Sequence, residues 1–417
     1  KSVKGIEAAN GWQQITPDRH HDWLNQRDDS FDEFIQLGNK KDKKTATVFK
    51  NYSRGLESGR DAWCYNFSTL KLSKNMVASI EAYNSEQKKL ASKEISSNKI
   101  SDFVTNDSKK ISWTSSLLSR LSRGSKAQFD EKSIATGMYR PYTKEAFYYD
   151  SMFNHRVGQM PQIFPEKDMP NKVIAVSGVG SKAFSCILFD TVPCLDAIEK
   201  GQCFPLKLYE KEDPNKKQPD IFTEQNNGMN EYTVKDGITH AALQHFRSAY
   251  PNENISKDDI FYYIYGLLHS EEYRAKYADN LSRELPRIPC VKTAEGFWGF
   301  VEAGRKLGDL HINYETADPY PLTLESTAQT DSDYYVKKMK FGGKGRDKDK
   351  TTIIYNDKIT LKNIPLEAYD YVVNGKPAIE WVMERQGVKT DKASGIVNDA
   401  NDYATETMND AKYPLKL

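Results

Sequence analysis

Apolar side chains recur every three to four residues in two parts of the chain, and this spacing predicts amphipathic helices. The first helix is expected at residues 72–90, where Ser73 can cap its start. A run of helices is expected at 236–285. There Ser256 precedes Asp259 in the pattern of a capping box, and the acidic side chains suit a helix N-terminus.

Short apolar runs punctuated by Gly, Pro and Asn occupy residues 138–210 and predict β-strands. The strands are expected at Ala146–Tyr149, Val173–Val176 and Cys186–Phe189. Residues 211–235 hold almost no apolar side chains and predict an exposed loop, at which we place a domain boundary.

The C-terminal part alternates between a strand pattern and helix patterns. Residues 351–361 predict a β-hairpin around an Asn-Asp turn. Helices are expected at 365–373 and 377–386, with Asn374-Gly375 ending the first of them.

These elements predict an α+β protein. A length of 417 residues is compatible with two or three domains. We interpret residues 1–60 as a connector and 61–230 as a mixed α/β lobe with short strands. Residues 231–417 are interpreted as a helix-rich lobe that carries a small β-hairpin. The chain begins with Lys1 rather than Met, so we expect a piece of a longer protein.

The charge of the chain is unevenly distributed, although its net value is only +1. Residues 88–126 hold nine Lys and Arg against three acids, and residues 334–350 hold seven against two. Residues 391–410 are acidic. Because phosphate contacts come from local basic patches, the distribution is more informative than the sum.

Basic and aromatic residues are interleaved in three segments, a mixture that suits phosphate and base contacts as well as ordinary solvated surface. The first segment contains Lys109, Lys110, Trp113, Arg120, Arg123 and Lys126. The second contains Tyr139, Arg140, Tyr142, Tyr148, Tyr149 and Arg156. The third contains Lys337, Lys338, Lys340, Phe341, Lys344 and Arg346, with nearby glycines that could let a ligand approach the backbone. Arg54 and Arg60 are weaker candidates, because Arg60 and Asp61 could form an ion pair.

One string has the spacing of a dinucleotide-binding loop. Residues 177–183 (SGVGSKA) follow a predicted strand and fit a relaxed G-x-G-x-x-A pattern, in which backbone N–H groups would hold a phosphate. However, residues 184–189 resemble a second strand rather than the required helix. A plain glycine turn is therefore the preferred interpretation.

Other catalytic patterns are incomplete. Asp318-Pro319-Tyr320-Pro321 lacks the adjacent prolines of an amino-methyltransferase loop, and His240 and His245 are not spaced for a metal on one helix face. The five cysteines form no C-x-x-C pair, which is typical of reduced thiols in a cytoplasm.

No apolar run is long enough for a membrane span. We therefore expect no membrane association, and no metal or cofactor bound by this chain.

Several long strings carry a specific resemblance. They include GRDAWCYNFS (59–68), YRPYTKEAFYYD (139–150), VIAVSGVGS (173–181) and LHINYE (310–315). DIFYYIYGLLHSEEYRAKYADNLSRELPRIP (259–289) and IIYNDKITLKNIPLEAYDYVVNGKPAIEWVMERQGV (353–388) belong to the same set. From about residue 10 onward, the chain resembles the C-terminal target-recognition part of Type ISP restriction–modification enzymes.

The resemblance implies a parent polypeptide with a nuclease, an ATP-driven motor and an adenine-N6 methyltransferase, which together use S-adenosylmethionine, ATP and Mg²⁺. The chain itself would recognise double-stranded DNA and contact those three domains. Residues 11–27 (GWQQITPDRHHDWLNQR) are similar to the segment that leaves the methyltransferase core. The resemblance identifies no base-contacting residue and no DNA target.

Three hypotheses follow. The leading one is sequence-specific binding of duplex DNA, with no catalysis by this chain. The second is a nucleotide- or S-adenosylmethionine-binding module built on Gly178–Ala183. The third is a structural clamp between the domains of the parent enzyme, without DNA affinity of its own.

Overall fold

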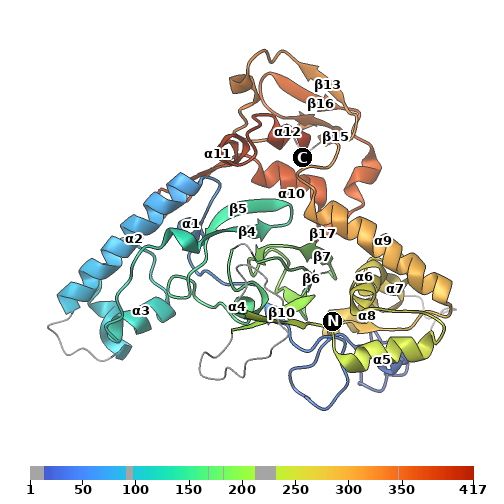
Figure 1. The fold of residues 1–417 in the computed structure, drawn as a ribbon. Helices are drawn as coiled ribbons and strands as arrows, with labels where there is room; N and C mark the ends of the chain where they lie inside the picture. The colour runs from blue at the N-terminus through green and yellow to red at the C-terminus, as the bar shows by residue number, and fades with distance from the viewer. Residues whose placement is uncertain (1–13, 91–96, 168, 182, 212–231, 346) are drawn as a thin grey trace, which may run out of the picture.

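Two four-stranded sheets lie at the centre of the computed structural model, which describes residues 14–90, 97–167, 169–181, 183–211, 232–345 and 347–417 (Figure 1). The first sheet has the order β2-β9-β6-β7 and consists of Ser53–Arg54, Gln202–Pro205, Val173–Val176 and Cys186–Phe189. The second has the order β3-β5-β4-β8 and consists of Tyr65–Asn66, Thr143–Tyr148, Ile134–Arg140 and Val192–Pro193. The three strands expected between 138 and 210 are thereby confirmed.

Strand β6 is buried on both faces and separates two hydrophobic cores. Val173 and Ala175 belong to the first core, which also contains Tyr83. Ile174 and Val176 belong to the second core. Successive side chains of a strand point to opposite faces, so a strand between two cores must be apolar at every position. This explains the uninterrupted apolar run in the sequence.

The predicted helix at 72–90 is confirmed and covers the first core. Helix α2 spans Thr69–Leu90 and lies along the edge of the molecule (Figure 1). The expected cap is wrong, because Ser73 lies inside the helix and its hydroxyl donates to the Thr69 carbonyl at 2.9 Å. Three shorter helices complete this side of the molecule: α1 (Asp61–Cys64), α3 (Ser115–Ser122) and α4 (Met160–Ile163).

The helices expected at 236–285 are also confirmed, and they surround the second core. They are α5 (His240–Ala249), α6 (Lys257–Leu267), α7 (Glu271–Lys276) and α8 (Ala278–Arg283), followed by α9 (Ala294–Ile312). Ser256 and Asp259 form the predicted capping box of α6. Helices α6 and α9 approach so closely that a Cβ on Gly304 would lie 2.0 Å from the Tyr262 carbonyl oxygen. Glycine is therefore required at this crossing.

The interpretation of residues 1–60 as a connector is wrong for the part from Phe31 onward. Phe31 and Phe49 are fully buried in the second core. Strand β1 (Ile35–Gln36) pairs with β12 (Arg287–Ile288), so the segment is built into the fold. Isolated apolar residues in a polar stretch had suggested a loop, but long-range packing decides otherwise.

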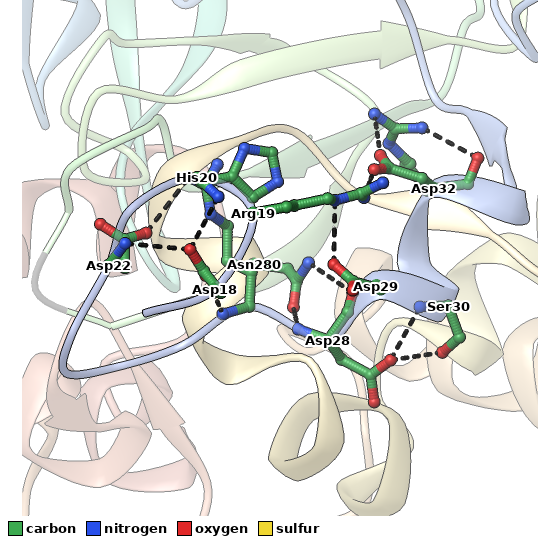
Figure 2. A network of polar contacts seen from close by, with 11 residues as sticks. Asp18, Arg19, His20, Asp22, Asp28, Asp29, Ser30, Asp32 and Asn280 are labelled. Carbon is green, nitrogen blue, oxygen red and sulfur yellow. Dashed lines mark hydrogen bonds and ion pairs between the residues drawn. The ribbon is translucent and has the colours of Figure 1, made fainter. Parts of the chain in front are cut away.

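Polar contacts fix the entry of this segment, as Figure 2 shows. The backbone N–H of Asp28 donates to Asn280 Oδ1 at 2.9 Å, and Asn280 Nδ2 donates to the Asp28 carbonyl at 3.1 Å. The Asp28 carboxylate also accepts from the backbone N–H of Ser30 at 2.9 Å. Helix α8 therefore holds the N-terminal segment by a two-point amide contact.

A boundary at residue 230 does not separate two cores, because the second core contains residues from both sides of it, including Phe204 and Phe246. The strands that flank the predicted loop also pair with each other: β10 (Lys207–Lys211) lies antiparallel to β11 (Tyr232–Asp236). Residues 212–231 of that loop lie outside the described residues.

A third four-stranded sheet lies apart from the centre, near the C-terminus (Figure 1). Its order is β13-β16-β15-β14, formed by Thr323–Ser326, Ile359–Lys362, Asp347–Ile354 and Lys340–Lys344. The predicted hairpin at 351–361 is confirmed as its central pair β15–β16, so the prediction had found half of a sheet. Three helices accompany it: α10 (Ala378–Arg385), α11 (Ala400–Glu406) and α12 (Tyr413–Lys416).

The helix expected at 365–373 is wrong. A 3-10 turn at Leu366–Tyr369 is followed by a hairpin of β17 (Val372–Val373) and β18 (Lys376–Pro377). Asn374 and Gly375 have φ values of 54° and 69° and form the hairpin turn rather than a helix end. Helix α10 confirms the helix expected at 377–386. It is followed by a second short hairpin, formed by β19 (Val388–Thr390) and β20 (Val397–Asp399).

The α+β class is thus confirmed. None of the helices in the described part of the chain is long and apolar enough to cross a membrane.

Candidate nucleic-acid interface

The glycine loop after β6 lacks the geometry of a nucleotide site. It joins β6 to the antiparallel strand β7, so no helix N-terminus follows it. The N–H groups of its two glycines are already used: Gly178 donates to the Glu199 carbonyl at 2.9 Å and Gly180 donates to the Ser282 carbonyl at 3.1 Å. A Cβ on Gly178 would lie 2.4 Å from the Lys200 carbonyl oxygen. The glycines serve close packing, and the nucleotide-binding hypothesis for this loop is wrong.

The remaining enzyme patterns gain no support from the fold. Within the described ranges, no group of three or more His, Cys, Asp or Glu side chains could hold a metal ion. The Asp318–Pro321 string lies in an irregular segment before β13 and lines an apolar cleft with its Pro319, Tyr320 and Pro321 side chains.

The first basic segment presents several exposed cations. Lys109, Lys110, Arg123 and Lys126 are exposed. Lys110 lies 3.7 Å from the Asp107 carboxylate. Arg120 donates to the Ser151 carbonyl at 2.9 Å, and the Trp113 ring nitrogen donates to the Thr105 carbonyl at 3.1 Å. Trp113 and Arg120 therefore hold loops in place.

The second segment is largely internal, and its two candidate DNA contacts, Arg140 and Tyr142, are mostly buried. The Arg140 guanidinium lies 3.4 Å from Asp61 and 4.0 Å from Asp196, with its side chain 14% exposed. Burial alone would lower the Arg140 pKa, but Cys194, Tyr139 and the two carboxylates outweigh it and raise that pKa. Arg140 is thus charged and already paired.

Tyr142 is buried, and its ring packs edge-on against His311 and Tyr314 at centroid distances of 6.0 and 5.4 Å. Its predicted contact with DNA gains no support from this position.

The two isolated arginines differ from each other. Arg54 is exposed on β2. Arg60 is only 4% exposed and donates to the Thr114 hydroxyl at 2.8 Å. Burial lowers the Arg60 pKa, and the nearby Asp61 pairs with Arg140 instead. The expected Arg60–Asp61 ion pair is therefore not the arrangement observed, and Arg60 is unsuited to a phosphate contact.

The third segment forms a basic groove, and we use that name for the cleft between β14, α10 and β19. Its volume is about 730 Å³. Three lysines of the third segment line it (Lys337, Lys338 and Lys340), together with Lys348 from the same basic stretch at 334–350. Lys376 and Lys389, which the sequence did not group with them, also line it. Lys344 is exposed on the adjoining strand, and Arg346 lies outside the described residues.

Charge pairing separates five of the six lysines of the basic groove into two sets, and the sixth, Lys348, lies 5.7 Å from the centroid of the Phe341 ring. Lys376 and Lys389 both contact the Glu384 carboxylate. For Lys337, Lys338 and Lys340, no carboxylate of the described residues lies within ion-pair distance. All three side chains are exposed and can therefore contact an external anion.

The glycines of this segment serve the hairpin itself. Gly343 has a φ of 85°, and a Cβ there would lie 2.2 Å from the Asp347 carbonyl oxygen. Strand β14 therefore requires glycine at this position, where it lies close to β15, whether or not a ligand approaches.

A smaller pocket adjoins the basic groove and shares Gly387 and Lys389 with it. We call it the Glu145 pocket, after the carboxylate in its lining. Its lining also includes Asp61, Tyr65, Tyr139, Arg385, Asp391 and Asn398. They come from both predicted lobes, so no local pattern in the sequence could have grouped them.

Glu145 is 1% exposed, and Asn398 Nδ2 donates to its Oε2 at 2.9 Å. Burial raises the Glu145 pKa to about 7, against the opposing effects of the Asn398 hydrogen bond and the Arg385 and Arg140 charges. A carboxylate in the lining of a polar pocket with such a shifted pKa is a candidate for ligand contact.

Comparison with known proteins now assigns the family. The family model of the Type ISP C-terminal specificity domain matches residues 47–417. The chain belongs to this family. The resemblance seen in the sequence strings is thereby confirmed, and the basic groove and the Glu145 pocket are features of a Type ISP specificity domain.

Solved structures agree with this assignment. A nuclease-deletion mutant of the Type ISP restriction–modification enzyme LlaGI, in complex with a DNA substrate mimic, is 37% identical with a TM-score of 0.80. The ATP-dependent Type ISP enzyme LlaBIII bound to DNA is 36% identical with a TM-score of 0.81. The DrdV–DNA complex is 28% identical with a TM-score of 0.78. Comparison with curated protein sequences gives no match.

The matched regions cover almost all of this chain but a minority of each relative. The shares of this chain are 97%, 97% and 100%, and the shares of the three relatives are 29%, 24% and 39%. The chain therefore corresponds to about a quarter to two fifths of the proteins it resembles.

Proposed function

We propose that this specificity domain binds double-stranded DNA in a sequence-specific manner and makes its phosphate contacts through the basic groove. The observation that carries the proposal is the set of Lys337, Lys338 and Lys340, which line one cleft and have no carboxylate partner among the described residues. Such lysines can neutralise phosphates without first breaking an ion pair.

Two relatives support the assignment of the ligand. LlaGI was determined in complex with a DNA substrate mimic, and LlaBIII was determined bound to DNA. At 36–37% identity over nearly the whole of this chain, a shared ligand class is the simplest expectation.

The finer proposal concerns the parent enzyme. We propose that the bound domain selects the DNA site at which the parent's other domains methylate adenine at N6 or cleave DNA in an ATP-dependent reaction. S-adenosylmethionine, ATP and Mg²⁺ would be used by the methyltransferase, motor and nuclease parts, in the cytoplasm. The chain itself would act by binding.

The test is a fluorescence anisotropy titration of duplex DNA over a series of salt concentrations. The triple variant K337A/K338A/K340A should bind every sequence more weakly, and its salt slope should fall by about one unit per lost phosphate contact. The matched control is K41A/K43A/K44A, which removes the same charge from an exposed loop elsewhere. Equal affinities and slopes for the two triple variants would contradict the groove assignment.

The inter-domain clamp makes the opposite prediction for the unmodified chain. A domain that only joins other domains should show no DNA retention even at low salt. Such a result would overturn the proposed function as a whole, whereas binding without sensitivity to the lysine triple would overturn only the location.

A further inference from the structure

The Glu145 pocket has the size and chemistry of a site for a single base rather than for a phosphate. Its volume is about 280 Å³. This space is too small for a duplex, whose major groove alone is about 12 Å wide. Three carboxylates line it, from Asp61, Glu145 and Asp391, and would repel an anion. A neutral, planar ring with polar edges meets no such repulsion.

Glu145 offers one free hydrogen-bond acceptor at this site. Asn398 is held by its own contacts, because its Oδ1 accepts from the Phe67 backbone N–H at 2.8 Å while its Nδ2 donates to Glu145 Oε2. Glu145 Oε1 has no donor among the residues that the structure describes. This oxygen can therefore accept a hydrogen bond from a ligand that supplies an N–H group.

Arg385 supplies donors beside this acceptor. Its guanidinium lies over the rings of Tyr139 and Trp381, at 5.8 and 5.6 Å from their centroids, which restricts its position. Its Nη2 contacts Glu384 at 3.2 Å, but its Nε is buried with no partner in the described part of the chain. The lining thus combines a free acceptor with a guanidinium that can donate.

We propose that the Glu145 pocket accepts one nucleobase unstacked from the DNA, of the kind that has a ring N–H next to a carbonyl oxygen. Thymine and guanine have this edge, because their N–H would donate to Glu145 while their carbonyl accepts from Arg385. Adenine and cytosine have a ring nitrogen acceptor at that place, so they could pair only if the base shifted to bring its exocyclic amino group to Glu145 and its ring nitrogen to Arg385. The proposal rests on the proposed function, since the base arrives on DNA bound in the adjoining basic groove.

The proposal extends to the walls of the pocket. Tyr65 and Tyr139 line it and lie with their ring centroids 5.0 Å apart. Aromatic side chains are the usual neighbours of an unstacked base, because they replace part of the stacking that the base loses.

The experiment compares short duplexes that carry one unpaired, bulged base, since a bulged base is already partly unstacked. Affinities are measured by fluorescence anisotropy at a pH above about 7, where the Glu145 carboxyl is ionised. Duplexes with bulged thymine or guanine should bind about tenfold more tightly than those with bulged adenine or cytosine. Equal affinities for all four bulges would overturn the pocket proposal.

The variant E145Q tests whether Glu145 causes the preference for bulged thymine and guanine. Its amide oxygen can still accept from Asn398, so its NH₂ group is turned toward the ligand. The thymine and guanine preference should then disappear or reverse. The triple variant K337A/K338A/K340A is the matched control, because it should weaken binding of all four bulged duplexes alike and keep their ratio. A preference that survives in E145Q would contradict the assignment.

A second readout locates the base directly and does not depend on a variant. A bulged 5-iodouracil should photocrosslink to Tyr139 or Tyr65, as identified by mass spectrometry of the digested chain. Crosslinks only to other surfaces would overturn the proposal. If no duplex of any kind binds, the proposed function itself fails, which is distinct from binding without base preference.

Discussion

Two basic and aromatic segments of similar composition have opposite environments in this molecule. Around Arg140 and Tyr142, the side chains point into the protein, where carboxylates and rings already satisfy them. Around Lys337, Lys338 and Lys340, the side chains line a cleft without carboxylate partners among the described residues. The difference teaches that a cation is available to a ligand only where the fold leaves it both accessible and unpaired. The first region should therefore affect stability, and the second should affect binding.

The largest expected effect is that of Tyr142→Ala. Removal of this buried ring would leave a cavity next to His311 and Tyr314, so the free energy of unfolding should fall by about 3–4 kcal/mol. Urea denaturation followed by fluorescence measures this. The control Tyr320→Ala removes a ring that is 67% exposed and should change stability by less than about 0.5 kcal/mol. Similar small losses of unfolding free energy for Tyr142→Ala and Tyr320→Ala would contradict the conclusion that the region around Tyr142 supports stability.

The pH dependence of Glu145 is expected to be the next largest effect. Burial raises its pKa in the folded protein to about 7, above the ordinary value of 4.5, so the fold favours the protonated form. The contribution of Glu145 to stability is therefore complete below pH 4.5 and is lost as pH rises to about 7. Relative to E145Q, the unmodified chain should lose about 2–3 kcal/mol of unfolding free energy over that window.

The comparison of the unmodified chain with E145Q isolates the effect of the Glu145 carboxyl, because buried His269 and His311 titrate in both proteins. Burial lowers the pKa of each histidine, so their contribution changes in the acidic range of both curves alike. Parallel stability curves for the unmodified chain and E145Q would contradict the raised pKa.

Arg140→Ala should have an intermediate effect. It would remove a mostly buried cation and leave Asp61 without its partner, but Asp61 and Asp196 are partly exposed and solvent compensates in part. A loss of about 2 kcal/mol in unfolding free energy is expected. The affinity of the folded protein for DNA should stay nearly unchanged. A large fall in affinity with unchanged stability would place Arg140 at the DNA after all.

The smallest expected effect is that of K109A/K110A. These two exposed lysines belong to the first basic segment, and only Lys110 has a nearby carboxylate, at 3.7 Å. If they contact phosphates, affinity should fall for all sequences alike and the salt slope should flatten by about one unit per contact. An unchanged slope in the anisotropy assay would leave the basic groove as the main electrostatic contact.

Much of the local structure was predictable because it depends on neighbours in the sequence. The capping box of α6 needs only Ser256 and Asp259, and the helix at 72–90 needs only its apolar period. The errors arose where distant partners decide. Asn374-Gly375 suits a helix end and a hairpin turn equally, and pairing of Val372–Val373 with Lys376–Pro377 selects the turn.

In the candidate site, too, some features depend on neighbours in the sequence and others depend on distant partners. The three lysines that keep their charge for a ligand are close in sequence and were predicted together. Lys376 and Lys389 join them only through the packing of α10 and β19 beside β14. Glu145, Arg385 and Asn398 form one pocket although they are far apart in the chain. No periodicity or spacing could have predicted that juxtaposition.

The sequence by itself determined the family, the apolar strands β6 and β7, the main helices and the concentration of positive charge in patches. These properties follow from residue order and short-range physics. Only the tertiary structure decided which cations remain available, because burial and pairing depend on residues brought together from both halves of the chain. It turned Arg140, Tyr142 and Arg60 inward and left Lys337, Lys338 and Lys340 free of carboxylates in the described part of the molecule.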